Sequence, residues 1–138
     1  MKEIRIGDIQ ISNDKPFVLI AGLNVLEEEK IILEVISKCK EDAEKFEIPY
    51  IFKASYDKAN RSSHSSYRGP GVKKGLAILS ELKKDFNVPV ISDIHTPEEA
   101  ELAAEVLDII QIPAFLSRQT DLIKAACMTS RPLNIKKG

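Results

Sequence analysis

Short apolar runs alternate with longer amphipathic stretches along this chain, and this alternation limits its possible folds more than any other feature. The apolar runs occupy residues 17–21, 49–52, 88–91, 108–112 and 133–135, and the amphipathic stretches occupy residues 26–46, 72–86, 96–106 and 118–128. Continuous apolar runs are typical of strands covered on both faces, as in parallel sheets. A hairpin is predicted before them, over residues 4–12. Strands and helices in this order predict right-handed βαβ units on a parallel sheet.

The amphipathic stretches have the features of ordinary packed helices. An apolar stripe from Ile32 to Phe46 follows a period of three to four residues, and we interpret it as core. Cys39 and Cys127 both fall in helical stretches and lack CxxC spacing, so we expect each to be a small buried apolar residue. Residues 96–99 predict a helix start, with Thr96 as N-cap and the third following residue, a glutamate, completing a capping box.

Polar side chains occur at the ends of all five predicted strands. They are Asn24, Lys53, Asp93, Gln111 and Lys136. In a (β/α)₈ barrel, that face is where the active site assembles. The alternative is that strands simply stop where polarity begins. No Gly-x-Gly-x-x-Gly follows the first strand, which argues against a dinucleotide-binding fold.

A long polar segment, residues 52–71, follows the second strand. It contains Lys53, Lys58, Arg61 and Arg68, interleaved with serines, and it ends in Gly-Pro-Gly. Cations, hydroxyls and an amide together suit a phosphorylated, hydroxylated small molecule. The segment could equally be a solvated basic loop, because runs of charge usually belong to the surface.

The overall charge excludes some classes of partner. The formal net charge is −1, so no global field recruits nucleic acid or an acidic membrane. No apolar run reaches membrane-spanning length, and the first five residues contain no apolar leader segment, so we expect a cytoplasmic protein.

The number of strands predicts an incomplete barrel. A (β/α)₈ barrel needs eight strands and about 250 residues, whereas these 138 residues contain five candidate strands. We therefore expect residues 1–138 to form the N-terminal portion of one (β/α)₈ barrel domain in a longer protein.

Several motifs in order along the chain resemble the 3-deoxy-D-manno-octulosonate 8-phosphate (Kdo8P) synthase family. They are the segment from Lys53 to Ser63, residues 16–20 with 22–24, residues 92–95, residues 108–121 and residues 134–137. The resemblance implies a (β/α)₈ barrel, usually a homotetramer, that condenses phosphoenolpyruvate with D-arabinose 5-phosphate for lipopolysaccharide synthesis and releases phosphate.

The resemblance also implies a role for individual residues. The catalytic residues would be Lys58, Asn24 and Asp93, and Gln111 would join Asp93 in positioning hydroxyls or water. The sugar phosphate would be held by Asn60, Arg61 and Ser62, and also by Arg118 of a neighbouring subunit. Phosphoenolpyruvate would be held by Lys53, Lys136, Pro113 and Ala114. The cations among them suit a site for two phosphates and a carboxylate.

One position bears on metal use. Metal-dependent members have a cysteine after Gly-Pro where this chain has Gly22-Leu23-Asn24. An amide is a poor ligand for a divalent transition metal, so the resemblance implies the metal-independent class, without a cofactor. We expect His95 to form hydrogen bonds in a loop. His64 stands one place earlier than in the family motif, which leaves its role open.

Two other functions are open. The related synthase that uses erythrose 4-phosphate typically has Lys-Pro-Arg-Thr where this chain has Asn60 to Ser63, which argues against it. A non-catalytic half-barrel that binds phosphosugars or partner subunits is the other. The family's further site groups lie in a second half, so we expect the 138 residues alone to be unable to assemble a complete site.

Overall fold

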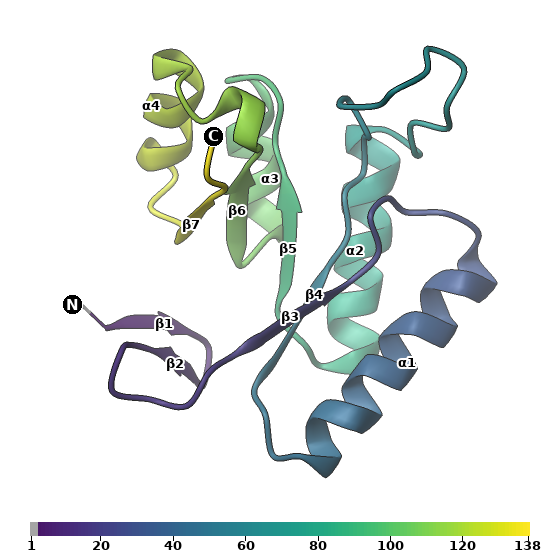
Figure 1. The fold of residues 1–138 in the computed structure, drawn as a ribbon, viewed down its shortest axis with the longest axis vertical. Coiled ribbons are helices and arrows are strands. Elements are labelled where there is room, and N and C mark those ends of the chain that lie inside the picture. Colours follow the sequence, from purple (N-terminus) through teal and green to yellow (C-terminus); the bar gives the residue numbers. More distant parts are fainter. Residues whose placement is uncertain (1–2) are drawn as a thin grey trace.

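The computed structural model describes residues 3–138, and its centre is a five-stranded parallel sheet (Figure 1). The strands are β3 (Leu19–Gly22), β4 (Tyr50–Lys53), β5 (Val90–Asp93), β6 (Ile109–Ile112) and β7 (Leu133–Ile135), and each pairs with the next in the chain. An antiparallel hairpin, β1 (Ile4–Ile6) and β2 (Ile9–Ile11), precedes them, as predicted. We expected no apolar leader segment in the first five residues, and two of these, Met1 and Lys2, lie outside the described residues.

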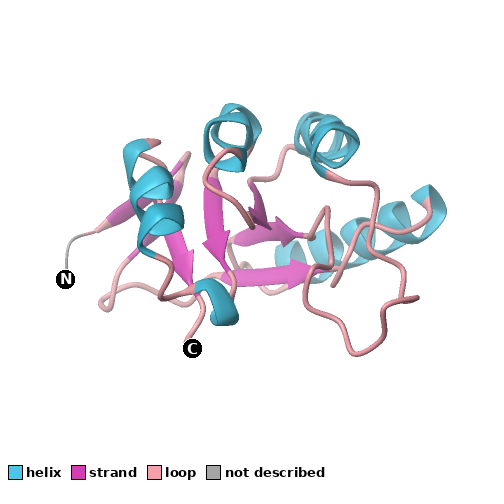
Figure 2. Cartoon of the chain, turned by 90° about the horizontal axis from the view of Figure 1, so that it is seen from above, coloured by secondary structure: helices cyan, strands magenta, loops and turns pink. Residues whose placement is uncertain are grey.

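Helices connect the parallel strands and lie along one face of the curved sheet (Figure 2). They are α1 (Glu29–Lys45), α2 (Val72–Phe86), α3 (Glu99–Val106) and α4 (Thr120–Met128), with a 3₁₀ turn, η1 (Ala114–Leu116), before α4. Sequential parallel strands with helices outside are the arrangement of a (β/α)₈ barrel. The predicted fold class is confirmed: the structure is a curled half-barrel.

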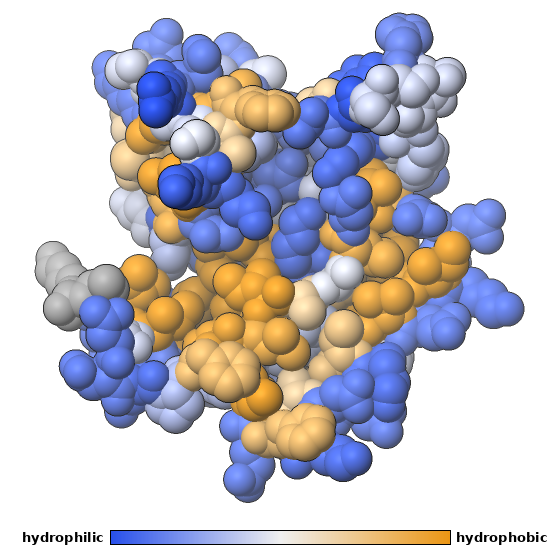
Figure 3. Space-filling view, in the orientation of Figure 1, coloured by the Kyte–Doolittle hydropathy of each residue, from blue (hydrophilic) through white to orange (hydrophobic). Residues whose placement is uncertain are grey.

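Successive side chains along a strand point to opposite faces of the sheet, so they belong to two different apolar clusters. Phe52, Val90 and Ile110 face the helices and are buried in the larger cluster. Residues one place earlier or later on the same strands face the concave side of the sheet. There Ile51 and Ile91 form the smaller cluster with Ile109 and with Ile6 of the hairpin. Figure 3 shows this concave side apolar in its lower part and polar toward the strand ends.

The starts of three helices differ from the prediction, and tertiary contacts explain the differences. Residues 26–28 do not join α1, because the Leu26 amide donates to the Ser55 carbonyl at 2.8 Å and holds the chain in a loop. Residues 118–119 precede α4, because the Gln119 amide closes the 3₁₀ turn on Leu116. The strands lie within two residues of their predicted positions.

The predicted capping box at the start of α3 is wrong. The helix begins at Glu99, and no side chain caps it. The Glu99 carboxylate instead turns inward and accepts hydrogen bonds from the Tyr56 hydroxyl and the His95 amide. In a capping box, the Glu99 carboxylate would accept from the Thr96 amide; here it accepts from the Tyr56 hydroxyl and the His95 amide instead.

Two predictions about buried helix residues are also wrong. Phe46 is 65% exposed, because it follows the last residue of α1 and is not part of the buried face of that helix, which Ile32, Ile36 and Ala43 form. Cys127 is exposed, because α4 turns Leu122 and Ala126 inward instead, whereas Cys39 is half-buried against the core.

No helix within residues 3–138 has the length and apolar character needed to cross a lipid bilayer.

A glycine sets how closely α2 approaches the segment after β4. Gly75 is buried in α2, and a Cβ there would overlap the Cβ of Tyr56 and lie 3.3 Å from its Cα. Tyr56 itself is fully buried. A methyl group at position 75 would therefore push α2 away from the chain that leads into the polar loop.

We predict that Gly75→Ala destabilises the protein, although alanine is the better helix former. Overpacking of this kind typically costs about 1–3 kcal/mol, which exceeds the gain of up to about 1 kcal/mol from helix propensity. Chemical denaturation measures the difference. The control is Lys74→Ala, at an exposed position of the same helix, for which we expect a change within about 0.5 kcal/mol. Unchanged or increased stability of G75A would contradict the packing argument.

Candidate active site

The polar side chains on the concave side of the sheet form one layer at the C-terminal ends of the strands. In this layer Asp93 of β5 pairs with Gln111 of β6, and Gln111 pairs with Asn134 of β7. Lys53 ends β4, two residues after the inward-facing Ile51. The polar layer thus continues the apolar layer below it and is held in register by the strand hydrogen bonds.

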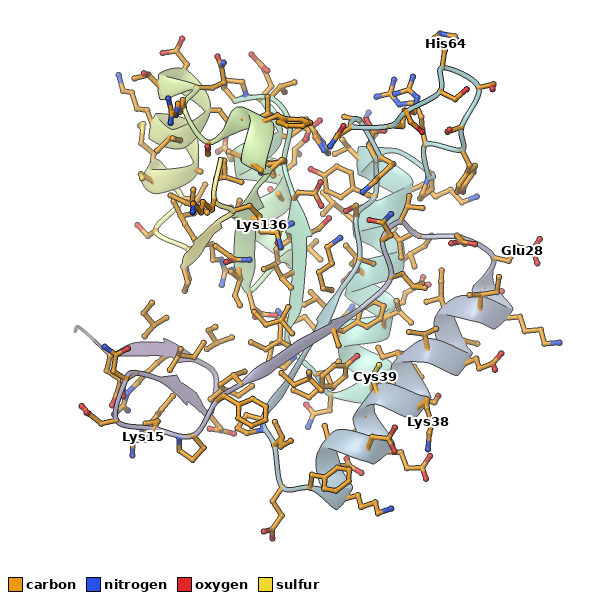
Figure 4. All side chains as sticks on the ribbon, viewed as in Figure 1. Lys15, Glu28, Lys38, Cys39, His64 and Lys136 are labelled. Atoms are coloured by element: carbon orange, nitrogen blue, oxygen red, sulfur yellow. The ribbon has the colours of Figure 1, made fainter. Side chains whose placement is uncertain are left out.

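This layer and the loops above it enclose a hollow of about 1040 Å³. Ten of the twelve predicted site residues line it: Asn24, Lys53, Lys58, Asn60, Arg61, Asp93, Gln111, Pro113, Ala114 and Lys136. Ser62 and Arg118 do not line it. Figure 4 shows Lys136 near the centre of the molecule and His64 at the far end of the polar loop, away from the sheet.

Lys53 and Asp93 are joined through a buried hydroxyl. The Lys53 ammonium donates to Ser55 Oγ at 2.8 Å, and Ser55 Oγ donates in turn to Asp93 Oδ1. Burial lowers the pKa of Lys53; the charge of Asp93 opposes this, and the neighbouring cations Lys58 and Lys136 add to it. Burial and the neighbouring cations thus disfavour the charged form of this lysine, and Asp93 is the group that favours it.

Asp93 is also bound to an imidazole. Its Oδ2 lies 3.0 Å from Nε2 of His95, as expected for a hydrogen-bonding histidine. Burial would raise the pKa of Asp93, but the donors from His95 and Ser55 and the charge of Lys53 together hold it below its usual value. Burial opposes the charge of His95, yet the Asp93 and Glu99 carboxylates outweigh burial and raise the pKa of His95 to about 9.

The polar loop is anchored at its base and then projects over the hollow. Arg68 donates twice to the Asp57 carboxylate, at 2.8 and 2.5 Å, and the Lys58 amide donates to the Arg68 carbonyl at 2.6 Å. Lys58 Nζ donates to Asn24 Oδ1 at 2.6 Å and so connects the loops after β3 and β4. Arg61 Nε is buried without a hydrogen-bond partner among the described residues. The loop is therefore a structured part of the site wall.

The opposite wall comes from β6, β7 and the segments that follow them. Asn134 donates to Gln111 Oε1 at 2.9 Å, and the Lys136 amide donates to the Ile112 carbonyl at 3.0 Å. These bonds hold Lys136 beside Pro113 and Ala114 at the rim of the hollow.

Sequence reasoning missed several polar residues of this site, and two of them, Ser55 and Asn134, share one feature. Both line the hollow, and both lie two residues from a lysine that was predicted there, Lys53 or Lys136. Because residues two apart in an extended segment point to the same side, the predicted positions of Lys53 and Lys136 could have indicated Ser55 and Asn134 as well. Asp57 also lines the hollow and was missed; its pairing with Arg68 across the loop has no local sequence signature.

Within residues 3–138, no three histidine, cysteine, aspartate or glutamate side chains are grouped so that they could hold a metal ion. Asn24 offers an amide, and its oxygen accepts from Lys58.

The chain is similar to known proteins along nearly its whole length. The model of a family described as "DAHP synthetase I family" matches residues 2–138. The chain is 58% identical over 137 residues to a 2-dehydro-3-deoxyphosphooctonate aldolase of Pseudomonas putida (strain GB-1) and 57% identical to one of Hahella chejuensis. Each match covers 99% of this chain and 49% of the relative, so the chain spans about half the length of these relatives.

We predict a pH-dependent contribution of His95 to stability. Its pKa of about 9 in the folded protein lies above the ordinary value of 6.5. The contribution is therefore full below pH 6.5 and lost as pH rises through 9. Allowing for residual solvent contact, it amounts to about 2 kcal/mol. The difference in unfolding free energy between the wild type and His95→Asn should shrink by that amount between pH 6 and pH 9.5. A difference that stays constant over this range would contradict the prediction.

Proposed function

The chain belongs to the DAHP synthetase I family, and on that premise we propose that it contributes to condensation of phosphoenolpyruvate with D-arabinose 5-phosphate. The products would be 3-deoxy-D-manno-octulosonate 8-phosphate and inorganic phosphate, on the route to lipopolysaccharide. The names of its relatives support this substrate pair, because 2-dehydro-3-deoxyphosphooctonate is the same product. The resemblance recognised from the motifs is thus confirmed at 58% identity.

The convergence of cations on a single hollow carries this proposal. Lys53, Lys58 and Arg61 come from the end of β4 and the loop that follows it, Lys136 comes from the segment after β7, and all four line the same space. The two substrates bring two phosphates and a carboxylate between them. Ammonium and guanidinium groups held in place before the substrates arrive can stabilise such anions without reorganising during the reaction.

The two ends of the hollow suit the two substrates. We assign the sugar phosphate to the end formed by the polar loop, with Asn60 and Arg61 in the lining of the hollow and Ser62 next to them in the chain, outside that lining. We assign phosphoenolpyruvate to the opposite end, with Lys136, Lys53 and the backbone at Pro113 and Ala114. Each anion then meets at least one cation.

Lys58 would act between the two substrates. The alkene carbon of phosphoenolpyruvate attacks the aldehyde carbon, and the aldehyde oxygen takes a proton from Lys58. Water then adds to the cationic carbon that bears the phosphate, positioned by Asp93 and Gln111, and gives up a proton. Loss of inorganic phosphate leaves the ketone. Asn24 would orient Lys58 through the contact between its oxygen and the ammonium.

The remaining groups of a complete site would come from outside these residues. We propose that residues 1–138 are the N-terminal portion of a single (β/α)₈ barrel domain. We also propose a cytoplasmic homotetramer in which Arg118 serves the sugar phosphate of a neighbouring subunit, which would fit its position outside the hollow.

A second candidate is the synthase that uses erythrose 4-phosphate. The description of the family model favours it, because DAHP synthetase I names that branch. The relatives at 58% identity favour the octulosonate branch instead. A non-catalytic half-barrel that binds phosphosugars is the third candidate.

Phosphate release by the full-length protein distinguishes the candidates. With phosphoenolpyruvate present, we expect release with arabinose 5-phosphate and at least about tenfold less with erythrose 4-phosphate, since each unsatisfied contact of a shorter sugar costs on the order of 1 kcal/mol or more. We also expect a chelator such as EDTA to leave the rate unchanged. The reverse sugar preference would assign the protein to the other branch, and binding of both substrates without phosphate release would favour the non-catalytic candidate.

The role of Lys58 predicts a large kinetic effect. Lys58→Met keeps the aliphatic stem and removes the proton and charge, so we expect kcat/KM to fall by about 10²-fold or more. The control is Lys73→Met, which removes an exposed lysine of α2 outside the hollow and should change kcat/KM less than twofold. Equal effects of K58M and K73M would remove Lys58 from the mechanism.

A further inference from the structure

Two buried ionisable side chains behind the hollow have no role in the proposed mechanism. The Tyr56 hydroxyl donates to Glu99 Oε2 at 2.8 Å, and the His95 amide donates to the same oxygen at 2.8 Å. Tyr56 is fully buried and the Glu99 side chain is 16% exposed. Neither side chain lines the hollow. A carboxylate so enclosed needs a function or a compensating charge.

The His95 ring lies between two carboxylates. Its Nε2 is 3.0 Å from Asp93 Oδ2, and its Nδ1 is 3.6 Å from Glu99 Oε2. Nδ1 is buried and has no hydrogen-bond partner among the described residues, so Glu99 is the group it faces. A neutral imidazole has one donor, whereas an imidazolium has two. Carboxylates facing both ring nitrogens therefore match the charged ring.

This arrangement continues to the cation in the hollow. The second oxygen of Asp93 accepts from Ser55, and Ser55 accepts from Lys53 Nζ at 2.8 Å. Glu99, His95, Asp93, Ser55 and Lys53 thus form an unbroken series of polar contacts from the start of α3 to the rim of the site.

We propose that Glu99, fixed by the Tyr56 hydroxyl, is a positioning residue that holds the His95 ring against Asp93 and thereby sets the place of Lys53 in the hollow. The effect on catalysis rests on the proposed function, whereas the effect on His95 does not. Without the Glu99 charge, the His95 ring loses its proton more easily. If the remaining proton stays on Nδ1, which faces residue 99, then Nε2 presents a lone pair to Asp93 instead of a donor. Asp93 would then lose the donor that fixes its orientation.

The groups that face His95 agree with this role. On its own segment they are Asp93 and Glu99, and from the segment after β4 it meets the Tyr56 ring edge-on, with centroids 6.1 Å apart. The nearest cation in the network, Lys53, lies 3.9 Å from Asp93 on the far side of that carboxylate. The two carboxylates outweigh burial and raise the pKa of His95 to about 9.

NMR titration of the full protein tests the contact directly. The His95 imidazole signals are identified by their loss in His95→Asn. We expect a midpoint well above 7 in the wild type and a midpoint lower by about one pH unit or more in Glu99→Gln, which keeps the shape and removes the charge. The matched control is Glu101→Gln, at an exposed position in the first turn of the same helix. It should leave the midpoint unchanged.

The pH profile of kcat/KM for phosphate release tests the consequence. We expect the alkaline decline in kcat/KM to begin at lower pH in E99Q and to be unchanged in E101Q, a shift that loss of stability alone would not produce.

The outcomes that contradict the proposal are distinct. A wild-type NMR midpoint for His95 at or below pH 7, or the same midpoint in E99Q, overturns the proposal; the wild-type titration decides even if E99Q does not fold. If the wild type releases no phosphate but the titrations behave as expected, the proposed function fails and the contact stands. If phosphate is released and the E99Q profile is unshifted, the positioning role fails alone.

Discussion

A buried carboxylate constrains the geometry of this half-barrel. Asp93 is 8% exposed, and an ionised group in such a place is stable only with close donors and counter-charges. The structure supplies them from three directions: a hydroxyl from the segment after β4, an imidazole from the loop after β5, and an ammonium from the end of β4. The contacts that stabilise the Asp93 carboxylate therefore hold together the segments that form the floor of the hollow.

The same requirement explains how a chain with a net charge of −1 can offer a cationic site. The hollow is lined by Lys53, Lys58, Arg61 and Lys136, which short segments bring to one rim of the sheet, and by only two carboxylates, those of Asp57 and Asp93. The charge of Lys53 is offset locally by Asp93, and the Lys58 ammonium is bound to the neutral side-chain oxygen of Asn24. The charge inside the hollow is thus set locally, so the total charge of the protein carries little information about it.

The sequence allowed the sheet and most of the hollow to be predicted, because both follow from periodicity. Strand side chains alternate every two residues, so a polar residue at or near the end of an apolar run, such as Lys53 or Gln111, indicates both the strand and the face on which that polar group lies. The helix starts could not be predicted in this way. The capping pattern at Thr96 was sound as a local signal, but Glu99 found buried donors on Tyr56 and His95 that no local rule includes. The predictions that Phe46 and Cys127 are buried failed for a related reason, because tertiary packing decides which side of a helix end is covered, and other residues of α1 and α4 face the core.

The order of strands in the sheet has a consequence for how the protein acquires its structure. Each strand from β4 to β7 pairs with the strand immediately before it in the chain. During synthesis, a newly emerged strand therefore finds its neighbour already available and does not have to wait for a distant segment. Folding can advance from the N-terminus one βαβ unit at a time, and loop closure at each step spans only one helix and its connections. The hollow at the strand ends therefore gains another part of its wall with each βαβ unit that is added to the sheet.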